Sequence, residues 1–259
     1  MIGVVSVALL GLLALSIPVG IVLFLLGFGV DTFFSSFPLT RGLGNMVWSS
    51  SNSATLIAIP FFVLLGEILV RSGVATRTYA ALDRWVSWLP GGLVHANVAT
   101  ATMFSATSGS SVATAATVAT VAMPAAGGTL GIMIPPSINL IVYGFLTQSS
   151  IPQLFLAGLI PGLALAIAFM AVTAVICLIR PDLGGVRRTF PFPQMLRALI
   201  DLIPILILFG LIVGSIYRGW ATPTEAAAVG VAGALLIALV VGGVSLSMLA
   251  QSLTGTVKI

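Results

Sequence analysis

Charged side chains are almost missing from the middle of this sequence. No Asp, Glu, Lys or Arg occurs from Trp85 to Ile179. In the whole chain, 6% of the residues are charged and 59% are hydrophobic, whereas a soluble domain carries about 25% charged residues. This scarcity of charge excludes a soluble domain. It predicts an integral membrane protein that is long enough for several spans of about 20 residues each.

Residues for metal, redox and nucleotide chemistry are also scarce. The single cysteine, Cys177, cannot form an internal disulfide and is expected to be a packing residue in an apolar run. One histidine, His95, and scattered carboxylates cannot build a transition-metal site, and no G-x-x-x-x-G-K loop for ATP is present. We therefore expect no cofactor and no direct use of ATP, and the chain is not expected to be an enzyme apart from the protease alternative given below. The net charge of +4 is interpreted as a sign of membrane orientation rather than of nucleic-acid binding.

The apolar runs predict an all-α polytopic membrane protein. We expect about six spanning helices, together with one re-entrant helical hairpin and one discontinuous helix. The first run has no basic leader and no clear cleavage site, so it is expected to be a retained span rather than a signal peptide. The runs that predict spanning helices are Gly3–Phe28, Thr55–Leu69, Ala125–Leu146, Leu156–Ile179, Ala198–Tyr217 and Thr222–Gly242.

Polar segments between these runs predict the membrane orientation. Residues 31–53 are expected to form a loop or a helix at the interface. Residues 71–90 include an amphipathic arm that is expected to lie on the membrane surface, and Glu67 can pair with Arg71 four residues later. The segments 71–90 and 180–197 hold most of the arginines, which favours the cytoplasmic side for both.

Two shorter patterns concern helix ends and helix packing. The sequence from Thr222 to Glu225 fits a capping box, with a proline at the first helical position. Glu225 is therefore expected to be structural rather than catalytic. Gly210 and Gly214 have the spacing of a close helix-packing face.

The segment after the amphipathic arm predicts a re-entrant hairpin. Its two apolar arms are Leu93–Ala106 and Ser111–Met123. At 1.5 Å per residue each arm reaches only about 20 Å, whereas the hydrocarbon core is about 30 Å thick. The alternative is one continuous helix from Leu93 to Met123, about 46 Å long. The hairpin is favoured because a continuous helix would put the two basic segments on opposite sides of the membrane.

Pro135 and Pro136 interrupt the next apolar run. A proline disfavours helical geometry at the residue before it. The first half-helix is therefore expected to stop near Met133 and to leave the carbonyls of residues 130–132 unpaired. Such a helix end suits a small cation. The second half leaves N–H groups at residues 137–139, which suit an anion.

The expected hairpin tip repeats this arrangement, with free carbonyls near residues 105–107 and free N–H groups near residues 110–111. Two facing half-helix pairs would make a site near the membrane midplane for a cation and a carboxylate together, as discontinuous helices do in secondary transporters. The alternative is that these Ser- and Gly-rich segments only pack helices tightly. A hairpin and a broken helix in neighbouring segments favour the site.

Five motifs at these positions resemble a known family. They are Ile59-Pro-Phe-Phe-Val-Leu-Leu-Gly-Glu67, Ser108-Gly-Ser-Ser-Val-Ala113, Gly131-Ile-Met-Ile-Pro-Pro-Ser-Ile138, Leu154-Phe-Leu-Ala-Gly-Leu-Ile-Pro-Gly162 and Ala221-Thr-Pro-Thr-Glu-Ala226. Together, and in this order, they resemble the large membrane subunit of tripartite ATP-independent periplasmic (TRAP) transporters.

The resemblance implies an elevator-type, sodium-coupled importer of small organic acids, such as C4-dicarboxylates or sialic acid, in the bacterial inner membrane. It implies a small membrane subunit and a periplasmic substrate-binding protein as partners. Family members hold two inverted repeats, and this chain resembles a shortened form that ends as the second repeat begins. The family also has a longer polar connection where Pro124 here runs directly into Ala125. Half of the expected site would thus be missing.

Carried over by resemblance, the functional residues fall in the hairpin and the broken helix. The implied division of the chain is 1–92 for scaffold helices and the interfacial arm, 93–155 for the transport-site region, and 156–259 for further scaffold helices and the start of the second repeat. The implied substrate-binding residues are Ser110, Ser111, Pro136, Ser137 and Asn139. The implied sodium-binding residues are Ser105, Ser108, Gly109, Gly128, Thr129, Gly131 and Pro135.

Four other functions stay open at the level of sequence. One is a sodium–dicarboxylate carrier of a related superfamily, which would not need a soluble binding protein, and another is an inactive fragment. A third is a passive channel. The fourth is an intramembrane serine protease with Ser108, Ser110 or Ser111 as nucleophile and His95 as base. It would require His95 within hydrogen-bond reach of the serine.

Overall fold

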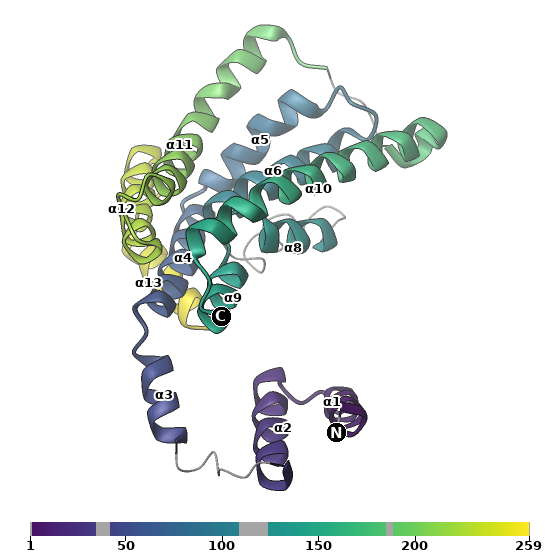
Figure 1. Cartoon of the computed structure of the whole chain (residues 1–259). Helices are drawn as coiled ribbons and strands as arrows, with labels where there is room; N and C mark the ends of the chain where they lie inside the picture. The colour runs from purple at the N-terminus through teal and green to yellow at the C-terminus, as the bar shows by residue number, and fades with distance from the viewer. Residues whose placement is uncertain (1, 35–41, 109–123, 185–188, 259) are drawn as a thin grey trace. The chain divides into compact units, whose positions relative to one another are not determined.

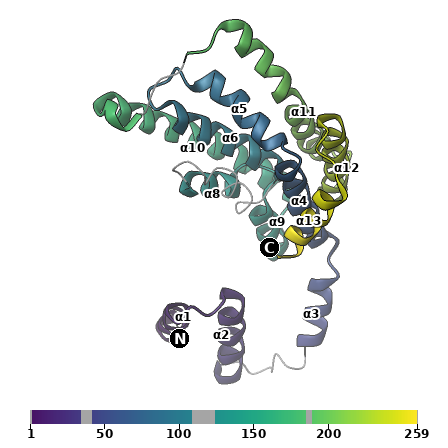
Figure 2. The ribbon, with the colours of Figure 1, turned by 180° about the vertical axis from the view of Figure 1, so that it is seen from behind.

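The computed structural model describes residues 2–34, 42–108, 124–184 and 189–258, and every regular element in these ranges is helical. The chain divides into two compact units, Met1–Ser53 and Ala54–Ile259. Figures 1 and 2 show the helices of both units from opposite sides. The predicted all-α class is thus confirmed for the described residues.

The first unit corrects one predicted span. Instead of a single helix over residues 3–28, the structure has α1 (Ile2–Ala14) and α2 (Val19–Phe34). Pro18 cannot donate a backbone hydrogen bond within a helix and disfavours helical geometry at the residue before it. Ser16 lies in the left-handed region, with φ of 57°. At 1.5 Å per residue, the 13 residues of α1 and the 16 of α2 reach about 20 Å and 24 Å.

A third helix completes this unit. It is α3 (Leu43–Ser51), which occupies the segment predicted to be a loop or a helix at the interface. The Trp48 side chain is 70% exposed. Such a side chain suits the headgroup level of a bilayer.

The second unit contains four helices long and apolar enough to cross a membrane. They are α4 (Ala54–Arg71), α10 (Ile151–Ile179), α11 (Phe192–Tyr217) and α12 (Pro223–Val241). Among the described residues, four of the six expected spans are thus single long helices. The run at residues 3–28 forms two short helices instead, and the run at residues 125–146 is divided into two helices of ten residues each, as expected for the discontinuous helix.

Shorter helices lie between and after these four. They are α5 (Val74–Val86), α6 (Gly92–Ser108), α8 (Pro124–Met133), α9 (Ile138–Thr147), the short 3-10 helix η2 (Pro181–Gly184) and α13 (Leu246–Lys258). The predicted amphipathic arm is confirmed as helix α5, which buries one face. Figures 1 and 2 agree in placing α10 along α6, with α8 beside both.

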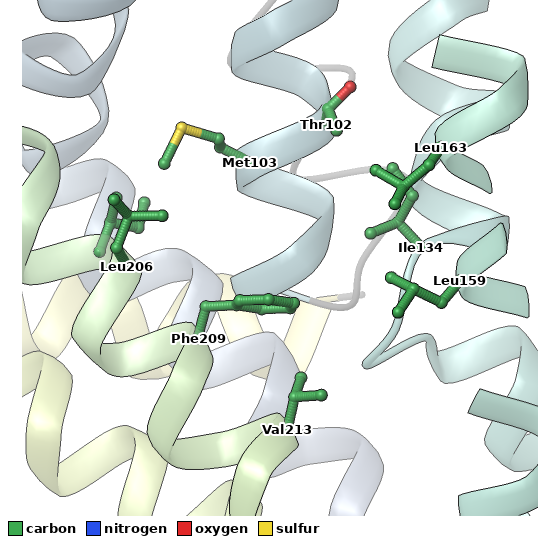
Figure 3. Close-up of a pocket in the computed structure, with 9 residues that line it drawn as sticks. Thr102, Met103, Ile134, Leu159, Leu163, Leu206, Phe209 and Val213 are labelled. Carbon is green, nitrogen blue, oxygen red and sulfur yellow. The ribbon is translucent and has the colours of Figure 1, made fainter. Parts of the chain in front are cut away.

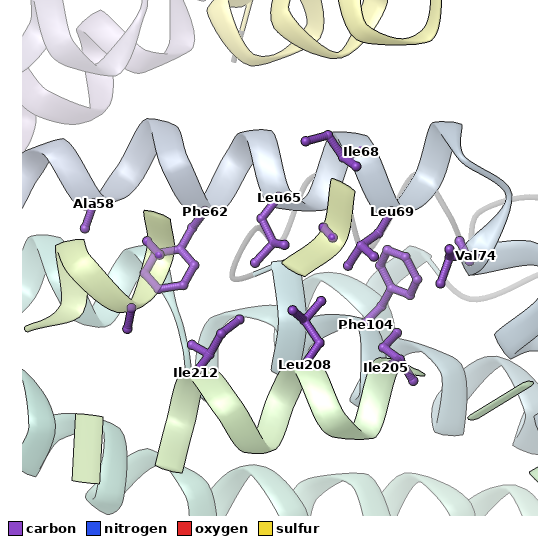
Figure 4. Close-up of a cluster of buried hydrophobic side chains, with 14 of the residues drawn as sticks. Ala58, Phe62, Leu65, Ile68, Leu69, Val74, Phe104, Ile205, Leu208 and Ile212 are labelled. Atoms are coloured by element: carbon purple, nitrogen blue, oxygen red, sulfur yellow. The ribbon is translucent and has the colours of Figure 1, made fainter. Parts of the chain in front are cut away.

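The core of the second unit lies where α12 packs against both α4 and α11, whose side chains share one apolar cluster. Phe62, Leu65 and Leu69 of α4 are fully buried. In Figure 4 they lie opposite Leu208 and Ile212 of α11. Lipid tails are as apolar as these side chains, so tight packing rather than escape from water holds such helices together.

The close approach of α12 depends on glycines that the sequence did not single out. A Cβ added at Gly230 would lie 2.8 Å from Ile212 Cδ1, and one added at Gly233 would lie 2.8 Å from Leu208 Cδ1. By contrast, a Cβ at Gly210 or Gly214 would meet nothing within 4 Å in the described part of the chain. For that part, the predicted packing face on α11 is therefore wrong, because the small residues that admit the neighbouring helix lie on α12.

Hydrogen bonds confirm two local predictions and one prediction about segments distant in the chain. Arg71 Nε donates to Glu67 Oε2 at 2.7 Å. Thr222 and Glu225 form the complete capping box at the start of α12. The Trp85 Nε1–H group donates to the Met195 carbonyl at 3.0 Å. This last bond joins the two arginine-rich segments, so both lie at the same end of α11, as expected.

We expect Gly230→Val to lower the free energy of unfolding by about 1–3 kcal/mol, because the added methyl groups overpack the contact with Ile212. Gly210→Val is the matched control, and its effect should stay within about 0.5 kcal/mol because its surroundings are open. Thermal unfolding of the two purified variants in detergent compares them. Equal losses would contradict the assignment of the packing face to α12.

Candidate functional site

The break between α8 and α9 is the centre of the candidate site. Helix α8 ends at Met133, as predicted, and α9 begins at Ile138, two residues later than the expected start near Pro136. Pro135, Pro136 and Ser137 between them are buried. Irregular backbone of this kind is tolerated at membrane depth only where protein buries it or water reaches it.

The two prolines decide which carbonyls of α8 lack a partner. A helix carbonyl accepts from the N–H four residues later. For Gly131 and Ile132 these residues are Pro135 and Pro136, which have no N–H. The Ser137 hydroxyl donates to the Ile132 carbonyl at 2.6 Å. The Gly131 carbonyl therefore lacks its helical donor, and no side chain among the described residues replaces that donor.

The structure corrects the expectation that all three carbonyls of residues 130–132 are unpaired. The Leu130 carbonyl accepts from the Ile134 N–H at 3.0 Å, because the helix hydrogen-bond pattern continues for one more residue. Of the three carbonyls, Gly131 thus remains as the one that can bind a cation.

The same serine leaves the start of α9 uncapped. Ser137 is the N-cap residue of α9, but its side chain makes no capping hydrogen bond there, because its hydroxyl bonds to α8 instead. The N–H groups in the first turn of a helix have no intrahelical acceptor. The N–H groups in the first turn of α9 are therefore not capped by Ser137, and anion binding there stays a prediction.

Helix α10 supports the break through two glycines. A Cβ added at Gly158 would lie 2.7 Å from the Met133 carbonyl oxygen, and one added at Gly162 would lie 2.8 Å from Ile134 Cγ1. Only residues without a side chain admit the backbone of the break at this distance. These glycines belong to the Leu154–Gly162 motif, but sequence analysis gave them no role in the site.

Helix α6 supports the break from another side. Its buried Val98 and Ala101 form an apolar cluster with Leu130 and Ile134. Ser105, one turn beyond Ala101, is fully buried, and its hydroxyl donates to the Ala101 carbonyl at 2.6 Å. The hydroxyl oxygen keeps lone pairs with which it can still accept a hydrogen bond or bind a cation.

The other predicted residues differ in their surroundings. Gly128 is half-buried, and Thr129 and Asn139 are exposed. Ser108 is the last described residue of α6. The predicted tip residues Gly109, Ser110 and Ser111, and the second arm of the hairpin, lie outside the described residues. Within the described part, the structure brings Gly131, Pro135, Pro136 and Ser137 together and leaves Asn139 at the surface.

Helix α6 also buries polar groups that sequence analysis did not assign to the site. Asn97 and Thr100 are buried three residues apart, and none of their side-chain polar atoms has a hydrogen-bond partner within the described residues. Buried groups of this kind are usually satisfied by ordered water. The sequence feature that could have identified these residues is Asn97 itself, a polar side chain within a helical segment that has no charged residues.

His95 does not support a serine protease in which Ser108 is the nucleophile, and the other two candidate serines lie outside the described residues. Its Nε2 lies 2.8 Å from the Pro90 carbonyl oxygen, and the ring is buried near Gly91. Because α6 is one unbroken helix from Gly92 to Ser108, His95 and Ser108 lie about 20 Å apart along its axis. This distance excludes a hydrogen bond between them.

A cavity of about 310 Å³ lies beside the break but does not suit an organic acid. Figure 3 shows Met103 of α6 and Phe209 of α11 on one side, and Leu159 and Leu163 of α10 on the other. The hydroxyl of Thr102, a further lining residue, already donates to the Val98 carbonyl. A carboxylate placed here would be desolvated without compensation.

Electrostatic attraction at the break must therefore come from the backbone. No Asp, Glu, Lys or Arg occurs from Trp85 to Ile179, and His95 is the one histidine there. The C-terminal end of α8 carries partial negative charge and the N-terminal end of α9 carries partial positive charge, each about half an elementary charge. The two helix ends can hold a small cation and an anion near each other without a charged side chain.

Comparison with known proteins identifies a family of similar sequences. The sequence model of the tripartite ATP-independent periplasmic transporter, DctM component, matches residues 6–259. The chain is 36% identical over 219 residues to the C4-dicarboxylate TRAP transporter large permease protein DctM of Pseudomonas aeruginosa, covering 78% of this chain and 50% of the relative.

Two further relatives show similar coverage. The chain is 33% identical over 250 residues to the sialic acid TRAP transporter large permease protein SiaM of Vibrio cholerae, covering 90% of this chain and 57% of the relative. It is 32% identical over 263 residues to the ectoine TRAP transporter large permease protein TeaC of Halomonas elongata, covering 90% and 58%. The chain thus spans between half and three-fifths of the length of these relatives.

We expect Gly158→Ala to separate α10 from the break, because the new methyl group would meet a backbone oxygen that cannot rotate away. The free energy of unfolding should fall by about 1–3 kcal/mol. Gly214→Ala, whose Cβ meets nothing within 4 Å, should leave it unchanged or raise it slightly, since alanine favours the helix. Chemical unfolding in detergent measures both. A Gly158→Ala variant as stable as the control would contradict the close approach.

We expect Ser137→Ala to destabilise the protein by about 1–3 kcal/mol, because it leaves the Ile132 carbonyl without a donor. Ser137→Thr keeps the hydroxyl and should retain more stability than Ser137→Ala. Ser149→Ala, at an exposed position, controls for loss of a serine hydroxyl elsewhere. The unfolding midpoints of the three variants are compared under identical detergent conditions. Equal midpoints for Ser137→Ala and Ser149→Ala would contradict a stabilising hydrogen bond from Ser137 to the Ile132 carbonyl.

Proposed function

Because this chain belongs to the DctM family of tripartite ATP-independent periplasmic transporters, we propose that it acts in the sodium-coupled import of small organic acids as part of a large permease subunit. The observation that carries the proposal is the break between α8 and α9. There, a carbonyl end and an N–H end of two half-helices meet in a segment without charged side chains. The family is one of transporters, so no catalytic role is assigned.

The cation in this proposal is sodium, bound at the end of α8. The Gly131 carbonyl would be one ligand, since Pro135 cannot donate to it, and the hydroxyl of the buried Ser105 on α6 is a second candidate. Sodium binding through carbonyl oxygens at a helix C-terminus is a known device of secondary transporters. Further ligands would come from residues 108–111, for which the sequence predicts a hairpin tip.

The anion would be the acid group of the substrate, bound at the start of α9. Two of the relatives are named for anionic substrates, C4-dicarboxylate and sialic acid, and another for ectoine, which also carries a carboxylate. An anionic group matches the uncapped N–H groups that follow Ser137. A bound sodium ion would reduce the cost of placing the anion in an uncharged site, which couples the two binding events.

The proposed assembly contains more than this chain. The resemblance to TRAP large permeases implies a small membrane subunit and a periplasmic substrate-binding protein as partners, in the bacterial inner membrane. Because the chain spans about half the length of its relatives, we propose that the full site needs the remaining half of a large permease. In that arrangement the broken helix would move with the hairpin in an elevator-type transport step.

Sodium-dependent protection of the start of α9 tests the proposal. Asn139→Cys, in a Cys177→Ser background, places a thiol at an exposed position just after the break. Labelling by a polar maleimide should be slower in sodium than in potassium, and slower again when succinate, sialic acid or ectoine is added with sodium. Gln148→Cys, at the exposed far end of α9, should react at the same rate in all conditions.

The outcomes separate sodium coupling from other functions. Protection of residue 139 by a carboxylate in potassium as well as in sodium would refute sodium coupling and favour a passive channel. Labelling that is insensitive to both sodium and carboxylates would refute a binding site at this break. Equal protection at residues 139 and 148 would indicate a general change of the protein rather than occupancy of the site.

A further inference from the structure

A polar groove lies between the end of α4 and one face of α13, away from the broken helix. It has a volume of about 330 Å³, and its lining includes Arg71 of α4 and Ser247, Gln251, Thr254 and Lys258 of α13. The four α13 residues recur at helical spacing and so form a single stripe. This is a hydrogen-bonding and cationic surface in a chain that has few charges.

Helix α13 presents three different faces. Met248 and Ser252 are buried, and Gly255 meets the Glu67 carboxylate of α4 so closely that a Cβ there would lie 2.5 Å from Oε2. Leu246 and Val257 are 87% and 86% exposed and lie on a second, apolar face. The polar stripe is the third. A helix with adjacent exposed apolar and polar faces suits the boundary between acyl chains and headgroups.

The two cations of the groove differ in how they are held. The Arg71 guanidinium donates to Glu67 at 2.7 Å and to Gln251 Oε1 at 3.1 Å, so its planar group is fixed in position. Gln251 is itself oriented by a hydrogen bond from its amide to Ser247 Oγ at 3.1 Å. Lys258 makes no salt bridge with any of the described residues. The groove therefore contains one fixed cation and one ammonium group that has no counter-charge among the described residues.

The position of the groove indicates which side of the membrane it faces. Thr224 at the start of α12 bonds to the Ala54 carbonyl at the start of α4, and Gly243 after α12 abuts Ser72 after α4. The groove lies at the second end, with Arg71 and helix α5. This end carries the arginine-rich segments, which favour the cytoplasmic side, where the leaflet surface is negatively charged.

We propose that this groove binds the phosphate of an anionic membrane lipid. The guanidinium of Arg71 and the ammonium of Lys258 supply charge, and the hydroxyls of Ser247 and Thr254 can donate hydrogen bonds to phosphate oxygens. The exposed Leu246 and Val257 on the adjacent face of α13 give the acyl chains an apolar surface. That apolar surface favours a lipid over a soluble phosphate, which would gain nothing from it.

Lipid binding to the purified chain, measured by native mass spectrometry in detergent, tests the proposal. The probes are short-chain phosphatidylglycerol and, as the zwitterionic comparison, phosphatidylcholine of the same chain length. We expect tighter binding of phosphatidylglycerol. Lys258→Gln should weaken that binding about fivefold, the factor expected for removing one basic residue near a membrane surface. Thr254→Glu should weaken it at least as much, because it puts a negative charge into the groove.

Arg218→Gln is the matched control. Arg218 lies over the Trp220 ring at 5.0 Å, in the loop between α11 and α12 and outside the groove, and its loss changes the net charge by the same amount as Lys258→Gln. Phosphatidylglycerol binding should be unchanged in this variant. Lys258 is in the last turn of α13, so its substitution should leave the unfolding midpoint unchanged, which thermal unfolding verifies.

Three results would overturn the proposal. Equal weakening by Lys258→Gln and Arg218→Gln would show that only net charge matters. Equal binding of the two lipids would remove the role of the anionic headgroup. Full competition by glycerol phosphate at the same concentration as the lipid would assign the groove to a soluble phosphate. None of these measurements involves sodium or transport, so the outcome is independent of the function proposed above.

Discussion

Two missing hydrogen-bond donors are the constraint on which the candidate site depends. Inside a bilayer each backbone carbonyl must find a donor or a wetted cavity, and Pro135 and Pro136 cannot supply one. The Ser137 hydroxyl satisfies one of the two carbonyls left over. The helix must then restart at Ile138 with uncapped N–H groups. One carbonyl without its helical donor and one uncapped helix start are therefore consequences of the same dipeptide.

The surrounding helices stabilise this irregular backbone without adding charge. Gly158 and Gly162 let α10 contact the backbone at the end of α8, and apolar residues of α6 cover the break from another side. In the proposed function, the site attracts ions only through helix ends, hydroxyls and the ions themselves. A neutral site of this kind binds an anion better once a cation is present, which is the physical basis for coupling sodium to an organic acid.

Charge in the second unit is concentrated at the ends of the long helices. The Glu67–Arg71 pair, the amphipathic helix α5 and the polar stripe of α13 all lie at the end where α4 and α12 finish. Between the two ends the helices pack through alanines, glycines and branched apolar side chains. This separation fits a protein whose middle contacts acyl chains and whose ends contact headgroups and water, and it places the proposed lipid site and the proposed transport site in different environments.

The sequence by itself determined the membrane class, the position of the broken helix, the amphipathic arm, the capping box and the Glu67–Arg71 pair. These features follow from hydropathy, proline chemistry and contacts within about four residues. Sequence did not determine which carbonyl at the break stays unpaired, that α12 rather than α11 supplies the packing glycines, or that residues 3–28 divide into two helices. It also missed Gly158, Gly162, Asn97 and Thr100. Only the tertiary structure decided most of these points. The space beside a glycine depends on helices distant in the chain, and hydropathy and proline chemistry do not say to which of two adjacent helix ends the Ser137 hydroxyl donates.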